Sequence, residues 1–266
     1  MYIDGGIIKQ ELDGQDHPYE PMNSTLSIDI SKSWSADTVE FKVTPKTNEP
    51  VTLSSQAIWN HPSGNAFYIF GGKAERTNPE NIITDGIWKF TVDGKGGGSW
   101  AKEQPSNVNT FETISFADGM AFASTYGPSG GIGFSIGGTV TNTTEPQAKF
   151  NASGGVIWRD GMVAYDMETK TVSSSDISMA VSTGSTWHSR AQFVPQFGPN
   201  GLVFLIGGFA GNKSNAIDSG LDFGNISFFD PKDRKWRWQS TRGSIPQQRA
   251  GHCMVGVPGP AGTFEM

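Results

Sequence analysis

The chain has 266 residues, a formal net charge of −6 and only 17% charged residues, and glycine occupies 34 positions. This balance argues against a nucleic-acid-binding protein, because phosphate contacts need clustered lysine and arginine. No stretch approaches the ~18 apolar residues of a membrane-spanning helix, and no basic, apolar leader opens the chain. We therefore expect membrane association only through segments outside this chain.

An apolar run that ends in a pair of glycines occurs four times along the chain. The pairs are Gly5 and Gly6, Gly71 and Gly72, Gly137 and Gly138, and Gly207 and Gly208. The second glycines are 66, 66 and 70 residues apart, and Trp34, Trp100 and Trp236 each follow one of them by 28 residues. A period of this size predicts an array of similar supersecondary units.

Each predicted unit contains several short strands. After each glycine pair and a polar loop comes a run with period-two alternation, at residues 26–30, 86–90, 161–165 and 225–229, which predicts half-buried strands. A further apolar run precedes the pairs, as in residues 54–59 and 120–124, and the tryptophans mark a last strand. Four short strands per unit are the content of one propeller blade. We expect Trp34, Trp100 and Trp236 to be largely buried at equivalent positions between adjacent blades.

Several of these features together resemble the Kelch repeat: paired glycines that end a second strand, an aromatic–aspartate step on the third, and a trailing tryptophan. Tyr165-Asp166 and Phe229-Asp230 fit this pattern, and Arg249-Ala250-Gly251-His252 fits the start of a further unit. The resemblance covers essentially the whole chain and is closest to Kelch propellers of fungal cell-surface proteins. It implies an all-β, Kelch-type β-propeller. The third unit departs from the pattern, since Asp166 stands where the spacing would place a tryptophan, so we expect its fourth strand near residues 170–172.

We expect one propeller domain over residues 1–266. The predicted blades cover about 1–45, 51–105, 114–178 and 186–241, and residues 246–266 open a fifth blade. The first unit begins inside a second strand, so the predicted ring is incomplete and the chain is expected to be a fragment of a longer protein.

Acceptor triplets for N-glycosylation occur in predicted loops or at loop edges at Asn23, Asn142, Asn151 and Asn212. A fifth triplet at Asn225 opens a predicted strand and is less suitable. The resemblance implies an extracellular or cell-surface location for the full-length parent, and these triplets are consistent with that expectation.

A search for catalytic chemistry finds no constellation. The four histidines, His17, His61, His188 and His252, show no metal-ligand spacing, and no serine has a partnered histidine. We therefore predict no catalytic residue, no cofactor and no metal site.

The predicted function is a non-catalytic binding or scaffold module. It would recognise an unknown protein or a cell-wall carbohydrate through long loops on one propeller face, at residues 72–86, 138–161 and 208–224. The alternative is a copper radical oxidase of the galactose oxidase type, which shares the architecture. That chemistry needs two histidines, two tyrosines and a tyrosine–cysteine cross-link, and Cys253 is the only cysteine.

Overall fold

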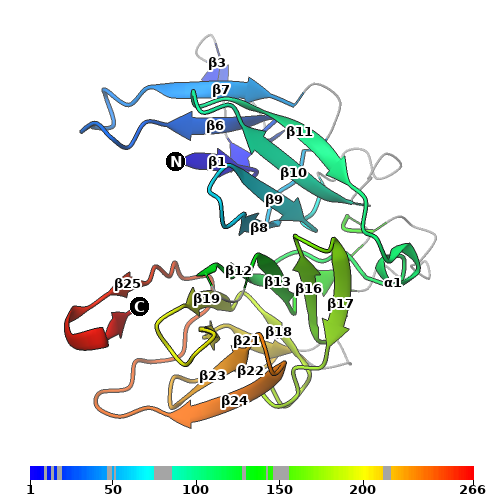
Figure 1. The fold of residues 1–266 in the computed structure, drawn as a ribbon, viewed down its shortest axis with the longest axis vertical. Coiled ribbons are helices and arrows are strands. Elements are labelled where there is room, and N and C mark those ends of the chain that lie inside the picture. The colour runs from blue at the N-terminus through cyan, green and yellow to red at the C-terminus, as the bar shows by residue number, and fades with distance from the viewer. Residues whose placement is uncertain are drawn as a thin grey trace.

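The computed structural model describes residues 1–8, 11–12, 15–16, 20–46, 50, 52–74, 86–127, 130–141, 143–145, 156–211 and 217–266. Four antiparallel sheets carry most of its regular structure (Figure 1). The first sheet consists of β1 (Tyr2–Asp4), β6 (Ser24–Ile28) and β7 (Phe41–Pro45). The second consists of β8 (Ala57–Asn60), β9 (Ala66–Phe70), β10 (Ile87–Val92) and β11 (Gly98–Glu103).

The third and fourth sheets repeat the four-stranded arrangement. The third consists of β12 (Ala121–Ser124), β13 (Ile132–Ile136), β16 (Met162–Asp166) and β17 (Thr171–Ser175). The fourth consists of β19 (Arg190–Val194), β20 (Leu202–Ile206), β23 (Asn225–Asp230) and β24 (Lys235–Ser240). Among the described residues the helical content is one short α-helix, α1 (Val108–Phe111), a 3-10 turn, Pro260–Gly262, and a single 3-10 residue, Gly127.

Small two- and three-stranded sheets extend these four. They contain β2 (Ile7–Ile8) with β5 (Glu20–Pro21), β3 (Glu11–Leu12) with β4 (Gln15–Asp16), β14 (Thr139–Val140) with β15 (Ile157–Trp158), β18 (Ser185–Trp187) with β21 (Phe209–Gly211) and β22 (Ile217–Gly220), and β25 (Val257–Pro258) with β26 (Phe264–Glu265).

The main strands of each sheet follow one another in chain order from the inside to the outside of the molecule. The first strand β12 contacts both β8 and β19, the first strands of the neighbouring blades, so the second, third and fourth sheets radiate from a common axis. Radially repeated antiparallel sheets of this kind form a β-propeller, and the all-β propeller predicted from the sequence is confirmed. The arc of blades is open between β1 and the β25–β26 hairpin (Figure 1).

The glycine pairs lie where each second strand ends, and both glycines of every pair have positive φ. A Cβ at Gly137 would overlap the backbone of Thr186 at the start of the next blade, and one at Gly208 would overlap Ser189, the residue before the first strand of its own blade. The pair therefore allows three stretches of backbone to meet at close range. Within the described part of the chain, a Cβ at Gly6 would meet no atom within 4 Å, and β1 is the innermost strand of the first sheet.

The prediction for Trp34 is wrong. The pairing register matches Phe90 with Trp100 and Phe229 with Trp236, and the equivalent pairs in the first and third sheets are Ile28 with Phe41 and Tyr165 with Val172. Trp34 lies outside any strand, in the hairpin between β6 and β7, and is 47% exposed. That hairpin is longer than its counterparts. The position 28 residues after the second glycine therefore falls within the hairpin, before the fourth strand begins.

The other two marked tryptophans lie in fourth strands but differ in burial. Trp236 is 7% exposed, whereas Trp100 is only half-buried. Beyond the fourth blade, Gly208 N donates to Arg249 O at 2.8 Å, as Gly138 N donates to Thr186 O at 2.7 Å, so residue 249 takes the place that starts a following blade.

The hydrophobic core lies in the seams between blades. One cluster joins the second and third blades around Trp59, Phe70 and Tyr165, and another joins the third and fourth around Phe134, Phe229 and Trp236. No helix in the described part of the chain is long and apolar enough to cross a bilayer.

Candidate functional site

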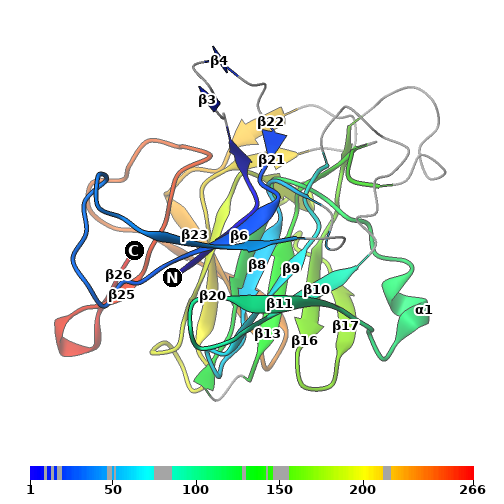
Figure 2. The same cartoon turned by 90° about the horizontal axis from the view of Figure 1, so that it is seen from above.

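The segments that follow the glycine pairs meet at one end of the propeller, at the top of Figure 2. Ala74 N donates to Thr143 O at 2.9 Å, which joins the segment of the second blade to that of the third. Gly211 in β21 packs against the indole of Trp158 in β15, which joins the third to the fourth. We call the described parts of this surface, residues 73–74, 139–141, 143–145, 156–160, 209–211 and 217–223, the loop face.

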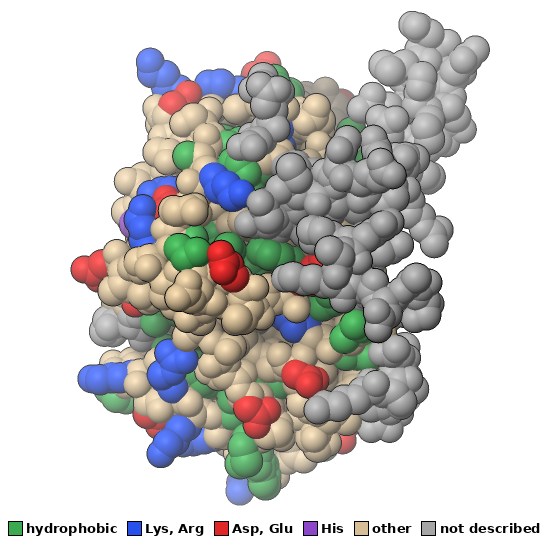
Figure 3. Space-filling model, turned by 90° about the vertical axis from the view of Figure 1, so that its right-hand side faces the viewer, with side chains coloured by type: hydrophobic (Ala, Val, Ile, Leu, Met, Phe, Trp, Pro, Cys, Tyr) green, Lys and Arg blue, Asp and Glu red, His purple; other side chains and the backbone are tan. Residues whose placement is uncertain are grey.

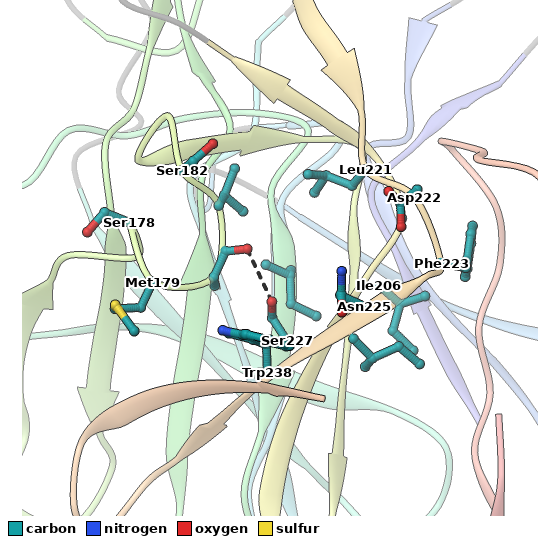
Figure 4. A pocket seen from close by; sticks show the side chains of 15 residues that line it. Ser178, Met179, Ser182, Ile206, Leu221, Asp222, Phe223, Asn225, Ser227 and Trp238 are labelled. Carbon is teal, nitrogen blue, oxygen red and sulfur yellow. Dashed lines mark hydrogen bonds between the residues drawn. The ribbon is translucent and has the colours of Figure 1, made fainter. Parts of the chain in front are cut away.

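A groove of about 330 Å³ opens in the seam between the third and fourth blades, at the loop-face end (Figure 4). One wall is the connector that enters the fourth blade, with Ser178, Met179 and Ser182, and the other wall is formed by β23, β24 and the loop before them. We call it the Trp238 groove, because the indole of Trp238 borders it and is 56% exposed.

A small residue on β23 makes room for this groove. Ser227 pairs with Leu205, the residue three positions before the second glycine of its blade. The residues that pair with the equivalent position in the other blades are Leu26, Trp88 and Val163. The Ser227 hydroxyl donates to Ala180 O at 3.1 Å and so fixes the connector opposite β23. Trp238 is the cross-strand partner of Ser227, and without a large neighbour its indole remains in solvent.

Polar groups complete the lining of the Trp238 groove. The carboxylate of Asp222 accepts from Gly224 N at 2.6 Å, and the Asn225 side-chain oxygen accepts from Ser240 Oγ at 3.0 Å. An exposed indole beside hydroxyl, amide and carboxylate groups can stack on an apolar ring face while bonding the polar substituents of the same ligand.

A second pocket occupies the equivalent place one blade earlier. It has a volume of about 400 Å³ and lies in the seam between the second and third blades, beside the β14–β15 hairpin. We call it the Arg159 pocket; its polar lining includes Ser115, Glu145, Arg159, Asp160 and Ser174.

A third cavity of about 500 Å³ lies on the propeller axis and tests the copper oxidase alternative. Its described lining brings together one imidazole, His61, one phenol, Tyr126, and the thiol of Cys253, where that chemistry needs two imidazoles and two phenols. His61 Nδ1 is 2.6 Å from Ser63 Oγ, and the Tyr126 ring lies 5.1 Å from that of Phe193. The residues present do not fit a copper radical site.

Two other tyrosines lie in the seam between the second and third blades. The rings of Tyr68 and Tyr165 are 5.7 Å apart, and burial, aided by the charge of Glu103, raises the pKa of Tyr68 to about 12. Burial raises the pKa of Tyr165 as well. Within the described residues, histidine, cysteine, aspartate and glutamate form no group of three that could hold a metal ion.

The predicted glycosylation sites are only partly within the described residues. Asn23 is exposed between β5 and β6, whereas Asn142, Asn151 and Asn212 lie outside the described residues, as does His17. Asn225 is exposed and borders the Trp238 groove. On the face drawn in Figure 3, basic and acidic side chains are interspersed.

The comparisons with known proteins support the fold alone. No protein-family model matches the sequence, and no curated protein is significantly similar to it. Among solved structures, the chain is similar to that of YjhT, a Kelch-type β-propeller, with 16% sequence identity and a TM-score of 0.52 over 83% of this chain and 53% of that one. The chain thus spans about half the length of that structure.

Proposed function

We propose that this chain is a non-catalytic recognition module that binds a carbohydrate through its loop face, with the Trp238 groove as the principal contact. The observation that carries the proposal is the exposed indole of Trp238 at the edge of a polar groove. Trp236, two residues earlier on the same strand, is buried in the seam. The second tryptophan is therefore not needed to close the seam.

The groove has the size and chemistry of a small-ligand site. Its volume of about 330 Å³ falls at the lower end of the range of about 300–1,000 Å³ for ligand pockets. A flat aromatic face with nearby Ser182, Asp222 and Asn225 suits a sugar ring, which offers an apolar face and a rim of hydroxyls. The walls belong to a rigid scaffold, since the connector is bonded to β23 through Ser227.

The lining also supports a binding role over a hydrolytic one. Asp222 is the one carboxylate among the residues that line the groove, and it already accepts from Gly224 N. Glycoside hydrolysis generally uses two carboxylates that flank the bond to be cleaved.

We also propose a cell-surface location for the parent protein, on the basis of the resemblance to fungal Kelch proteins and the exposed acceptor Asn23. Secretory expression followed by enzymatic deglycosylation tests it: a mass shift is expected, and it should be smaller by one glycan in Asn23→Gln. The same mass before and after treatment would leave the location without support.

A glycan array read with wild type and two tryptophan variants tests the binding proposal. Trp238→Ala should weaken binding of the best glycan by about tenfold or more, the loss expected for one stacked aromatic contact. Its free energy of unfolding should stay within about 0.5 kcal/mol of wild type, because the side chain is exposed.

Trp34→Ala is the matched control, since Trp34 is a similarly exposed indole on the first blade. This variant should bind like wild type. Equal loss in both variants would contradict the proposal, and so would a blank array together with a protein partner whose binding depends on Trp238.

A further inference from the structure

The Arg159 pocket contains a buried cation that is anchored from both sides. Arg159 is 6% exposed, and its backbone N donates to Gly138 O at 2.9 Å. Its carbonyl accepts from Ser185 Oγ at 2.8 Å, so a glycine pair and the next blade together fix the backbone. The side chain enters the seam, where Nη2 donates to Ser135 Oγ at 2.7 Å.

The guanidinium is poorly satisfied by the protein. Nη1 reaches Ser115 O only at 3.5 Å, and Nε has no hydrogen-bond partner. An arginine presents five N–H donors in a fixed planar fork. Buried donors of a charged group that lack partners destabilise the protein, so these atoms favour an acceptor supplied from outside.

The nearest buried carboxylate, Glu145, does not neutralise this charge. It is 2% exposed, its Oε1 accepts from Phe116 N at 2.7 Å, and among the described residues it forms no ion pair with Arg159. Burial lowers the pKa of Arg159 to about 9, and the charge of Glu145 offsets only part of that shift. A cation in this position is stabilised by any additional negative charge that enters the pocket.

We infer that the Arg159 pocket binds the carboxylate of a small polar ligand, with the guanidinium of Arg159 as the donor. The planar fork matches a carboxylate in a bidentate arrangement. Glu145 and Asp160 line the same pocket and disfavour a dianion such as phosphate. The inference rests on the proposed function only in taking the ligand to be a sugar, and it adds a second site, one blade away from the Trp238 groove, that takes an acidic one.

Calorimetric titration with matched probes tests this inference on the full chain. D-glucuronate and D-glucose differ by a carboxylate in place of a hydroxymethyl group, and inorganic phosphate tests charge alone. We expect glucuronate to bind about 10- to 100-fold more tightly than glucose, as expected for a charge-assisted hydrogen-bonded pair, and more tightly than phosphate. Equal binding of glucuronate and glucose, tighter binding of phosphate, or no glucuronate binding would overturn the inference.

Two variants localise the effect. Arg159→Met should abolish the preference for glucuronate, and Arg242→Met, a change of an exposed arginine on the far side of the fourth blade, should not. Glu145→Gln keeps an oxygen to accept from Phe116 N but removes the negative charge, so it should tighten glucuronate binding. The Glu145→Gln variant tests the inference even if Arg159→Met does not fold. Weaker glucuronate binding by Glu145→Gln would contradict the claim that the ligand carboxylate binds beside Arg159 and is repelled by Glu145.

The experiment also separates this inference from the proposed function. Trp238→Ala leaves the Arg159 pocket intact and should retain the preference for glucuronate. If wild type binds neutral glycans through Trp238 but shows no preference for glucuronate, the carboxylate inference fails and the proposed function stands.

Discussion

The seam between the first and second blades has a buried polar network beside its aromatic contacts, whereas the seam between the third and fourth blades is filled by an apolar cluster. The first contains a buried ion pair, in which Lys46 Nζ lies 2.9 Å from Asp4 Oδ2 with both side chains fully buried. Thr25 donates to the other oxygen of Asp4 at 2.7 Å and accepts from Trp100 Nε1 at 3.0 Å. Part of this seam is therefore a polar network whose partners come from both blades, and beside it Tyr2 packs on Phe67 and Phe90.

The seam between the third and fourth blades contains an apolar cluster instead. Phe134 and Phe229 meet edge to face with ring centroids 5.6 Å apart, and Trp236 packs on Phe229 at 5.3 Å. Val181 and Leu205 belong to the same cluster. Even the Trp236 Nε1 atom is buried there without a hydrogen-bond partner.

One sequence position accounts for much of this difference. Two residues before the second glycine, the first blade has Asp4, whereas the other three have Phe70, Ile136 and Ile206. A carboxylate at this buried position requires a cation and donors, and Lys46, Thr25 and Gln56 provide them. The propeller geometry thus requires well-packed seams between blades, but the side chains that fill a seam can be either polar or apolar.

The largest expected effect comes from breaking the polar network on one side only. Asp4→Ala leaves the ammonium of Lys46 buried without its partner and should cost about 3–5 kcal/mol in the free energy of unfolding. The double variant Asp4→Leu with Lys46→Met should recover most of this loss, because two apolar side chains can fill the same space. Urea denaturation measures both, and a double variant no more stable than Asp4→Ala would show that the pair is specifically required.

The corresponding change in the apolar seam should be milder. Phe229→Leu replaces one apolar side chain with another and should cost less than about 1.5 kcal/mol, since no charge is left unpaired. Phe228→Leu, which alters the opposite face of the same strand, is the control and should cost less than Phe229→Leu. A loss for Phe229→Leu as large as that for Asp4→Ala would refute the contrast between the seams.

The smallest expected effect is a dependence on pH at the entrance to the fourth blade. Burial, together with the charge of Arg190, lowers the pKa of His188, so the folded state favours the neutral imidazole. As the pH falls below the unfolded value of about 6.5, the unfolded chain takes up the proton more readily, and stability decreases.

Melting temperatures at pH 7 and pH 5 measure this dependence. His188→Asn should reduce the fall in melting temperature, because asparagine tolerates the positive φ of this position without titrating. His61 and His252 also have lowered pKa values and should maintain the remaining slope. If the melting temperature of the variant falls as much between pH 7 and pH 5 as that of wild type, His188 does not cause the pH dependence.

The repeat predicted the inner half of each blade better than the outer half. The glycine pairs end second strands throughout, because close backbone approach at that point leaves little choice of residue. Trp34 was assigned to a fourth strand by its distance from Gly6, yet hairpin length between the third and fourth strands varies from blade to blade. The pairing register of β6 with β7, which only the structure reveals, identifies Phe41 as the residue equivalent to Trp100 and Trp236.

The binding features could not be predicted from the same pattern. The repeat does not reveal the groove at Trp238, because the exposure of this indole depends on Ser227 and on the connector opposite. Arg159 carries no motif, and its burial depends on Ser135 and Glu145 from other parts of the chain. Trp59, whose Nε1 donates to Phe134 O at 2.9 Å, fills the seam from a first strand that the tryptophan count did not mark.

The long hairpin between β6 and β7, which contains Trp34, also has a practical use in protein engineering. It runs from residue 29 to residue 40, whereas the same connection in the fourth blade takes only residues 231–234, and both close strands in an unbroken register. Lengthening a flexible loop about threefold costs only about 1 kcal/mol of closure entropy. Nearly all of this hairpin is exposed, so it offers a place to graft an epitope or a reporter peptide without altering the sheet beneath it.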